Sequence, residues 1–345
     1  MKVLNAMLAS GMGGMEQMSV TYIKALVQNG HEVHALYMAD SPYLPELLAL
    51  GVHVHLMKSR SVLNPFNAIK IARLLRQIKP DVVFLHGNRV MRLARYPFIR
   101  LLLKTTAPLV GKAHNFDCKH LPIMDYSIAT TKYWQKEQAK ITGKDVFYLP
   151  NTVPLTPLRT PVFHDVPVIG AMSRLHINKA YDTLLKAARI LKDRGLTFKL
   201  VIGGDGPEKE NLSALCHDLG LDDIVSFIGW IKDKENFYDK IDIFCLSSRT
   251  EPFGTVVLEA MVRSCPVVST DCAGPKEMIE DGVSGLICPI DKVDEMADAL
   301  EKMLKNPQKA LEMGQEGRKA VEKSYAFPSF CQELDKLIQR VVSKR

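Results

Sequence analysis

The chain alternates short apolar runs rich in β-branched residues with amphipathic helical stretches, and it does so twice. The strand-like runs are residues 3–9, 32–38, 52–57, 81–87 and 108–114, and then 167–173, 198–207, 224–230, 241–248, 265–271 and 284–289. Apolar strands that are joined by helices predict a parallel sheet with both faces covered. The sequence therefore predicts an α/β protein with two doubly wound, Rossmann-like halves.

A proline-rich segment separates the halves. Residues 150–167, PNTVPLTPLRTPVFHDVP, hold five prolines, a composition that sustains neither a helix nor a central strand. We expect a first domain, a linker, a second domain and a final helix that packs back toward the first domain, with the bounds 1–153, 154–166, 167–325 and 326–345. Two such sheets predict a ligand cleft between them, at the carboxyl ends of the strands.

Composition narrows the class of protein. With 47% hydrophobic and 24% charged residues, the chain is neither disordered nor fibrous. Its apolar runs are much shorter than the ~20 residues that span a bilayer, and no signal-peptide pattern is visible. The seven cysteines are an odd number without CxxC pairs, which predicts reduced core residues and a cytoplasmic location.

The positive charge belongs to the first half. Residues 1–165 hold 20 Lys and Arg against 10 Asp and Glu, whereas residues 166–345 hold 25 against 28. A basic half is typical of proteins that meet nucleic acid, an anionic membrane or a phosphorylated ligand. Nucleic acid is not expected as a partner, because no basic surface interleaved with aromatics and no known module appears.

A glycine-rich loop follows the first strand. Gly11, Gly13 and Gly14 stand between a strand and a helix, where a backbone can approach a ligand and the helix N-terminus favours an anion. Their spacing is not GxGxxG, and no acidic residue ends the second strand, so a nicotinamide cofactor is not expected. A tight turn without a ligand is an equal alternative.

The second half carries the more specific candidates. Arg174 follows a strand and Lys179 precedes a helix, and two cations in such places suit a diphosphate. Solvated surface charges are the alternative for each residue alone. The loop at Gly204 repeats the strand–glycine–helix pattern.

The string SSRTEPFGTVVLEAM follows the strand at 241–248. It holds Glu251 in a loop, a turn through Phe253 and Gly254, and Thr255 at a helix start with Glu259 in the second turn. Backbone N–H groups of such a turn can hold a sugar hydroxyl or a phosphate oxygen. A carboxylate one turn inside the helix can accept both hydroxyls of a ribose.

Together these strings resemble the retaining nucleotide-sugar glycosyltransferases of family 4, which have the GT-B fold. The resemblance covers nearly the whole chain and rests on GMGGMEQ, AHN, PNTVP, SRLHINKAYDTLLKA, GGDGPEKENL, EPFGTVVLEA, AGPKEMI and DGVSGLICP. EPFGTVVLEA is specific, and its two glutamates have the family's spacing. Two positions depart from the family pattern: Ala180 and Thr152 stand where glycine is usual.

The resemblance implies roles for these residues. Arg174 and Lys179 would neutralise the donor diphosphate, Glu259 would hold the ribose, and Glu251 would lie near the transferred sugar. The donor-binding set would also include Gly13, Gly14, Gly204, Phe253, Gly254 and Thr255. His114 resembles the family's histidine that faces the donor sugar; a half-buried histidine with satisfied hydrogen bonds is the alternative.

The implied reaction is a metal-independent, retaining transfer of a hexosyl group from a nucleotide sugar. A UDP-sugar is favoured over a GDP-sugar, no cofactor is expected, and no Asp-x-Asp metal clamp occurs in the sequence. The implied acceptor is a glycan or lipid-linked glycan in the synthesis of lipopolysaccharide, capsule or another cell-surface polysaccharide. Two alternatives stay open: a nucleotide-sugar epimerase or hydrolase of the same fold, and a non-enzymatic nucleotide- or carbohydrate-binding protein.

A basic stretch in the first half bears on location. Residues 89–106 carry Arg89, Arg92, Arg95, Arg100 and Lys104 among apolar side chains. Such a stretch can rest on the anionic inner face of the cytoplasmic membrane. A solvated basic face over core leucines is an equal alternative.

Overall fold

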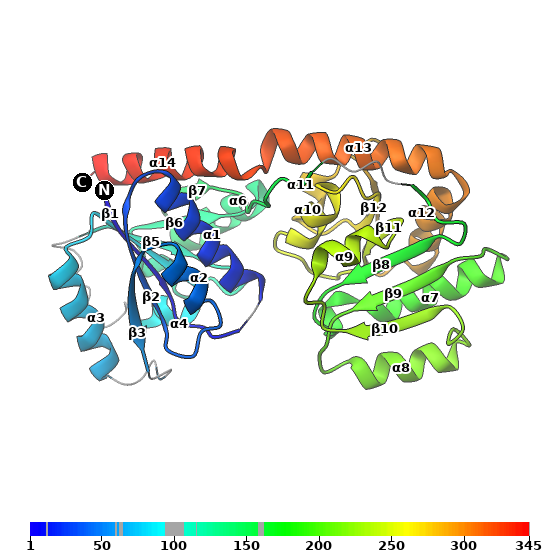
Figure 1. Cartoon of the computed structure of the whole chain (residues 1–345), viewed down its shortest axis with the longest axis horizontal. Coiled ribbons are helices and arrows are strands. Elements are labelled where there is room, and N and C mark those ends of the chain that lie inside the picture. The colour runs from blue at the N-terminus through cyan, green and yellow to red at the C-terminus, as the bar shows by residue number, and fades with distance from the viewer. Residues whose placement is uncertain are drawn as a thin grey trace. The chain divides into compact units, whose positions relative to one another are not determined.

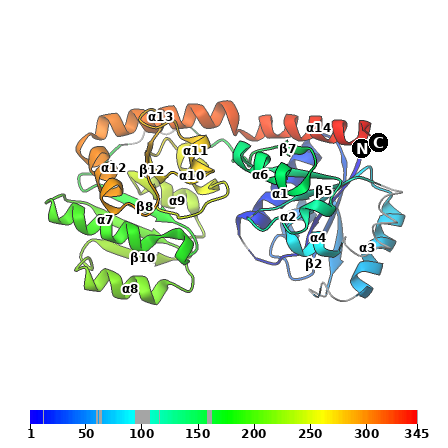
Figure 2. The same cartoon turned by 180° about the vertical axis from the view of Figure 1, so that it is seen from behind.

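The computed structural model describes residues 1–11, 13–58, 61, 65–93, 107–114, 116–157 and 162–344. It forms two compact units (Figures 1 and 2). The first contains Met1–Asn151 and Phe327–Arg345, and the second contains Thr152–Ala326. Each unit has one parallel sheet between helices, so the predicted pair of doubly wound α/β domains is confirmed.

The first unit holds a seven-stranded parallel sheet in the order β3-β2-β1-β4-β5-β6-β7. Its strands are β1 Lys2–Met7, β2 Glu32–Met38, β3 His53–Met57, β4 Val82–His86, β5 Leu109–Lys112, β6 Tyr126–Ala129 and β7 Val146–Tyr148. Its helices are α1 Gly14–Gln28, α2 Leu44–Ala49, α3 Pro65–Ile78, α4 Asn88–Leu93, η1 Leu121–Ile123, α6 Lys132–Thr142 and α14 Phe327–Ser343. β6 and β7 were not indicated by the sequence pattern, because both are short.

Alternation along β1 explains why helices cover both faces of this sheet. Val3 and Met7 pack with α1 and α14 in one apolar core, whereas Leu4 and Ala6 pack with α3 in another. Successive side chains of a strand point to opposite faces, so a strand that is apolar at nearly every position needs two covers. The final helix therefore completes the core of the first unit.

The second unit holds a six-stranded parallel sheet in the order β10-β9-β8-β11-β12-β13. Its strands are β8 Val168–Met172, β9 Lys199–Gly203, β10 Val225–Gly229, β11 Ile243–Leu246, β12 Val267–Thr270 and β13 Leu286–Cys288. Its helices are η2 Ile177–Lys179, α7 Tyr181–Asp193, α8 Lys209–Asp218, α9 Lys234–Asp239, α10 Thr255–Met261, α11 Pro275–Met278, α12 Val293–Lys305 and α13 Pro307–Ser324.

The segment between the two sheets is anchored to the second unit. Thr152 Oγ1 donates to Tyr325 O at 2.7 Å. The buried guanidinium of Arg318 donates to Val262 O at 2.6 Å and to Thr156 O at 2.8 Å. Residues 158–161 lie outside the described residues.

Other predictions meet the structure as follows. All seven cysteines are free and buried, as the sequence predicted. Among the described helices, each falls short of the length and apolar character that a membrane span requires. In the basic stretch, the Arg89 guanidinium donates to Leu8 O at 2.7 Å, and Arg95, Arg100 and Lys104 lie outside the described residues.

Candidate functional site

The sheet order of the second unit creates a topological switch point at β8. From β8 the chain moves outward to β9 and β10, then returns to the opposite side of β8 as β11. The loops that follow β8 and β11 therefore diverge, which opens a crevice at the carboxyl ends of these strands. Every candidate residue of the second unit follows β8, β9 or β11, and so stands at this end of the sheet.

Lys179 and Glu251 are brought together there. The ammonium of Lys179, at the end of η2, lies 2.5 Å from Glu251 Oε2 in the loop after β11. Their side chains are 22% and 13% exposed, so the pair is shielded yet reachable from solvent. Arg174 is exposed on the loop after β8 and makes no ion pair with any described residue. Among the described residues, Lys179 is thus a paired cation of the site, and Arg174 is one without an ion pair.

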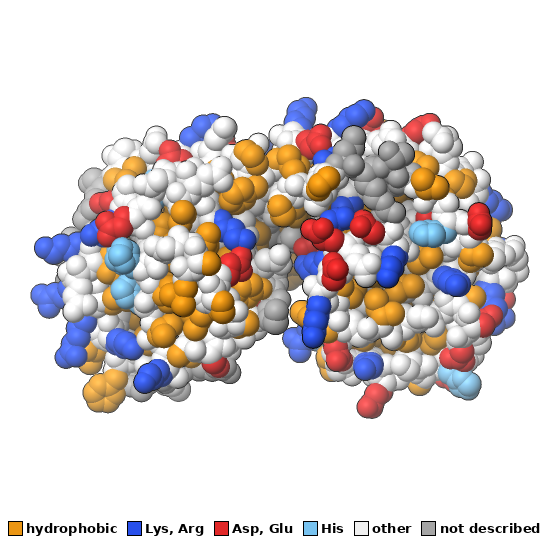
Figure 3. Space-filling view, in the orientation of Figure 1, with side chains coloured by type: hydrophobic (Ala, Val, Ile, Leu, Met, Phe, Trp, Pro, Cys, Tyr) orange, Lys and Arg blue, Asp and Glu red, His pale blue; other side chains and the backbone are white. Residues whose placement is uncertain are grey.

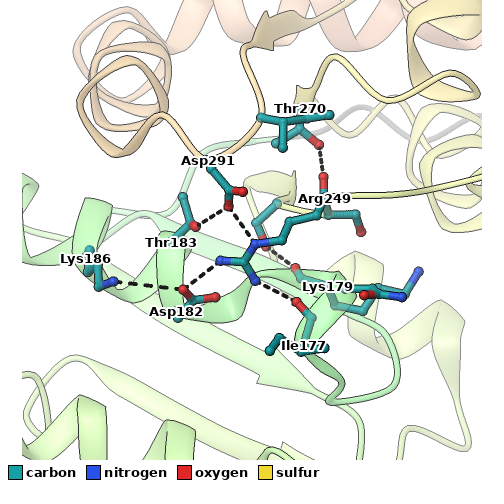
Figure 4. A network of polar contacts seen from close by, with 12 residues as sticks. Ile177, Lys179, Asp182, Thr183, Lys186, Arg249, Thr270 and Asp291 are labelled. Atoms are coloured by element: carbon teal, nitrogen blue, oxygen red, sulfur yellow. Dashed lines mark hydrogen bonds and ion pairs between the residues drawn. The ribbon is translucent and has the colours of Figure 1, made fainter.

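Lys179 ends the short helix η2, Ile177–Lys179, which we call the Lys179 turn. Arg249, which the sequence analysis missed, holds this turn in place (Figure 4). Arg249 donates to Ile177 O at 2.6 Å and to Asp182 Oδ2 at 2.8 Å, and its Nε lies 2.7 Å from Asp291 Oδ1. The pKa of Arg249 is raised, chiefly by its hydrogen bond to Asp182. Arg249 therefore positions η2 against the loop that carries Glu251.

Two further contacts fix the same turn. Arg249 N donates to Asn178 O at 2.8 Å, and Ser247 Oγ donates to Lys179 O at 2.8 Å. Ala180 follows with φ of 48°, in the left-handed region that favours glycine. This conformation explains physically why the family usually has glycine at the position.

Gly204 lets two loops of the site pack backbone against backbone. Its φ is +134°, and a Cβ there would lie 1.8 Å from Ser173 O. Ser173 N donates to Gly203 O, and Leu175 N donates to Asp205 O, at 3.1 and 2.9 Å. The loop that carries Arg174 is therefore held against the loop after β9.

The turn before α10 is held equally tightly. Gly254 precedes α10 with φ of +90°, and Thr255 is the first residue of the helix. Phe253 is buried and packs edge-on against Tyr325, with ring centroids 6.2 Å apart. A Cβ on Gly274 would lie 1.9 Å from Phe253 O, so only glycine fits beside this turn.

Glu259 makes its own pair, with residues that the sequence analysis did not single out. Lys234 Nζ lies 2.6 Å from Glu259 Oε1, and the Tyr238 hydroxyl lies 3.2 Å from Oε2. Both partners belong to α9. The Glu259 side chain is 14% exposed, so α9 presents this carboxylate in a defined orientation. The structure thus shows two separate ion pairs at the site, Lys179–Glu251 and Lys234–Glu259.

The first unit has a corresponding switch point, between β1 and β4. Gly13 precedes α1 with extended backbone, and Gly14 is the first residue of the helix. Beside them the carboxylate of Glu16 is buried; a Cβ on Gly13 would lie 3.1 Å from Glu16 Oε2. His114 follows β5, which neighbours β4 in the sheet.

His114 ends a chain of hydrogen bonds that runs into the first unit. His114 Nε2 lies 3.1 Å from His86 Nδ1, and His86 Nε2 lies 2.7 Å from Asn5 Oδ1. Asn5 Nδ2 donates to Ser19 Oγ at 2.8 Å, and that hydroxyl lies 2.6 Å from the Tyr37 hydroxyl. Polar residues inside apolar strands were the available signal for Asn5 and His86.

These contacts assign the tautomer of His114. The carbonyl oxygen of Ser19 also faces the Asn5 amide group, at 3.4 Å, and a carbonyl only accepts; Asn5 Oδ1 therefore faces His86 and accepts from His86 Nε2–H. Burial lowers the pKa of both histidines well below the usual value, so each ring is neutral. His86 Nδ1 then accepts from His114 Nε2–H, which leaves His114 Nδ1 without a proton and therefore able to accept a hydrogen bond.

Lys112 is a second unusual group, beside this series of hydrogen bonds. It is 1% exposed, and its ammonium donates to Tyr22 OH at 3.1 Å and to Asn151 Oδ1 at 2.9 Å. Burial lowers the pKa of Lys112 to about 7. Its charge also depresses the pKa of His86 and of His114. This group helps to keep His114 neutral.

Comparisons with known proteins agree with this architecture. A family model described as "Glycosyltransferase Family 4" matches residues 12–156, and one described as "Glycosyl transferases group 1" matches residues 159–320. The chain is 27% identical to the lipopolysaccharide core biosynthesis glycosyltransferase LpsE of Rhizobium meliloti, over 96% of each chain.

A second relative and one solved structure extend the comparison. The N-acetylgalactosamine-N,N'-diacetylbacillosaminyl-diphospho-undecaprenol 4-alpha-N-acetylgalactosaminyltransferase of Campylobacter jejuni is 27% identical over 86% of this chain and 88% of its own. The crystal structure of HepE from Anabaena, in complex with UDP and glucose, has a TM-score of 0.84 at 18% identity, over 99% of this chain and 100% of that chain. Sequence and fold lead to the same family: this chain belongs to the family 4-type glycosyltransferases, which have the GT-B fold.

Proposed function

We propose that this glycosyltransferase moves a hexosyl group from a nucleotide sugar to a glycan or glycolipid acceptor, with retention of configuration and without a catalytic metal ion. The observation that carries the proposal is the grouping of Lys179, Glu251 and Arg174 at the switch point of the second sheet. Parallel α/β sheets bind their ligands in this crevice. A UDP-sugar is the favoured donor, since the structural neighbour from Anabaena was crystallised with UDP and glucose.

Arg174 and Lys179 would bind the donor diphosphate. Breaking the anomeric bond leaves negative charge on the diphosphate, and cations that are already in place stabilise that charge at little reorganisation cost. The Lys179 turn is held by Arg249, so its ammonium is positioned before the donor arrives. Glu251, beside Lys179, would lie near the transferred sugar.

Glu259 would accept hydrogen bonds from the ribose hydroxyls. Lys234 and Tyr238 hold this carboxylate from one side, so its remaining acceptor capacity is directed. Gly204 and the turn through Phe253, Gly254 and Thr255 would let backbone approach the donor closely. These contacts keep the nucleotide in the second unit.

Residues of the first unit would contact the sugar and the acceptor. His114 would present its Nδ1 lone pair to a sugar hydroxyl, and Gly13 and Gly14 would let the loop after β1 approach phosphate and acceptor. The relatives from Rhizobium meliloti and Campylobacter jejuni are named for lipopolysaccharide core synthesis and for an undecaprenol-linked acceptor. They support an acceptor in cell-surface polysaccharide synthesis. The protein would act in the cytoplasm, in peripheral contact with the membrane.

Donor binding and turnover test the proposal. We expect UDP-sugars to raise the melting temperature more than GDP- or ADP-sugars, because a ligand that binds the native state stabilises it by mass action. Lys179→Ala should lower kcat by orders of magnitude in a folded protein. Lys192→Ala is the matched control, because Lys192 makes an exposed ion pair with Asp223 in the same unit.

Three outcomes would contradict parts of the proposal. Wild-type turnover by Lys179→Ala would remove the diphosphate role. Donor consumption at full rate without any acceptor would favour a hydrolase or epimerase. An inverted anomeric configuration of the product, read by NMR, would overturn retention.

A further inference from the structure

Four of the ten histidines of the chain lie between residues 31 and 55, outside the site described above. Figure 3 shows pale-blue histidine side chains side by side on the first unit, over the β2–β3 edge of its sheet. β3 is the outermost strand of the sheet order. This cluster has no part in the proposed transfer.

The strand register places three imidazoles and a carboxylate on one face. His34 pairs with His53, and Leu36 pairs with His55, in parallel β2 and β3. Residues two apart on a strand share a face. His34, His53, His55 and Glu32 therefore lie together, at the amino ends of β2 and β3.

The side chains contact one another. His34 Nε2 lies 3.0 Å from Glu32 Oε1, and His34 Nδ1 lies 2.9 Å from His55 Nε2. The rings of His34 and His53 are stacked with centroids 4.7 Å apart. Ligand atoms of Glu32, His34 and His53 all lie within 4.8 Å of one another.

We propose that Glu32, His34 and His53 bind a divalent transition-metal ion such as Zn²⁺, with His55 as the group that orients His34. Imidazole nitrogen and carboxylate oxygen are ordinary ligands for these ions, at ~2.0–2.2 Å. Two such ligands of a tetrahedral ion stand about 3.4 Å apart. The 3.0 Å separation of His34 Nε2 and Glu32 Oε1 is close to this value.

To bind one ion, the ligand atoms of Glu32 and His53 must move closer to His34 Nε2. His53 and Glu32 are exposed, so rotation about their side-chain bonds can bring them toward His34 Nε2. When His34 Nε2 binds the ion, its proton resides on Nδ1 and is donated to His55 Nε2. Such an outer hydrogen bond fixes the tautomer and the orientation of a metal-binding histidine. With three protein ligands, a water molecule would complete the coordination of the ion.

The local charges allow this binding. The carboxylate of Glu32 brings a negative charge to the ion. Lys2 opposes the ion, because its ammonium lies 3.3 Å from Glu32 Oε1. The Lys2 side chain is 34% exposed and can turn into solvent.

The position of the cluster predicts what the ion would do. The residues proposed for catalysis follow the carboxyl ends of the strands, whereas Glu32, His34 and His53 stand at the amino ends of β2 and β3. An ion there joins edge strand β3 to β2 through side chains, in addition to backbone pairing. It would stabilise the first unit and supply no group to the transfer reaction, which agrees with a metal-independent mechanism.

Titration of untagged, metal-free protein tests the proposal. Calorimetry with Zn²⁺ and absorption spectroscopy with Co²⁺ should show one bound equivalent, with the intense visible bands of a tetrahedral site, and the melting temperature should rise with the metal. His53→Ala should weaken binding by about tenfold or more, and His55→Phe by about 10–100-fold.

His217→Ala is the matched control, because His217 is an exposed histidine with a carboxylate partner, Asp222, in the second unit. It should bind metal as the wild type does. The proposal is overturned if the wild-type protein binds no equivalent, or if His53→Ala and His217→Ala have the same affinity. Circular dichroism of each variant excludes loss of fold as the cause.

Discussion

At the scale of single residues, the first unit buries groups that normally prefer water. Lys112 and His86 are each 1% exposed, and both have partners that are neutral rather than acidic. A buried charge without an opposite charge costs free energy, so burial lowers the pKa of such a lysine or histidine and favours its neutral form. The consequence is a neutral, directed His114 at the end of β5.

The role of Asn5 in directing His114 leads to a first prediction. Asn5→Ala removes the acceptor of His86 Nε2–H, so His114 should change from one Nε2–H tautomer to a mixture. Stability should fall by about 1–3 kcal/mol, because a buried donor loses its partner. Long-range ¹⁵N–¹H NMR spectra of the free protein report the tautomer. Asn67→Ala, which removes another buried asparagine, should leave it unchanged.

Lys112 leads to a second prediction, on pH dependence. Its folded-state pKa of about 7 lies below the ordinary lysine pKa of 10.5, so between these pH values the unfolded chain holds more protons. The free energy of unfolding therefore gains a contribution that rises with pH across this window, by about 5 kcal/mol at most. Lys112→Met should lose that rise. Denaturation at several pH values measures it, and equal slopes for both proteins would contradict the pKa shift.

At the scale of elements, the site depends on loops that touch through their backbones. The loop after β8 and the loop after β9 meet at Gly204, and the turn before α10 meets Gly274. Arg249 adds a side-chain link between η2, α7 and the loop after β13. Such contacts position Arg174, Lys179 and Glu251 before any ligand binds.

Gly204 leads to a prediction at this scale. Gly204→Ala places a Cβ 1.8 Å from Ser173 O at a φ of +134°, so we expect a loss of about 3 kcal/mol or more. Gly195→Ala is the control: its φ is +77° but the space is open, and it should cost about 1 kcal/mol. Trp230 fluorescence, in a Trp134→Phe background, follows unfolding of the second unit. Equal losses in the two variants would rule out the steric argument.

At the scale of the whole molecule, the first unit is built from two distant parts of the chain. The chain leaves it at Asn151 and returns at Phe327, where α14 packs on α1. Asn29 Nδ2 donates to Cys331 O at 2.8 Å, which ties the end of α1 to α14. The core of the first unit is thus complete only when the last residues of the chain are in place.

This arrangement leads to a prediction about coupling along the chain. Leu334 on α14 is fully buried, so Leu334→Ala should destabilise the first unit by about 2–5 kcal/mol. Hydrogen exchange should rise in residues 1–151 and leave 152–326 unchanged. Lys336→Ala, at an exposed position of the same helix, should change neither. A uniform rise across both units would show that they unfold together.

Much of this architecture was predictable from sequence. The double alternation of apolar strands and helices indicated two parallel sheets, and both are present. The short strands β6 and β7 were missed, because three or four residues carry too little periodicity. Gly204 and Lys179 were predicted as site residues from motifs. Their contacts in the structure explain physically why these residue types stand there.

The partners of those residues were not predictable. Lys234, Tyr238 and Arg249 come from other elements, and nothing in their local sequence indicates that they meet Glu259 or the Lys179 turn. The amphipathic patterns and glycines of a chain determine which elements form, because those signals act between near neighbours. Only tertiary structure decides which side chains from distant elements meet, since that depends on strand order and register. The histidines of β2 and β3 show this most plainly: the register of two strands places them on one face.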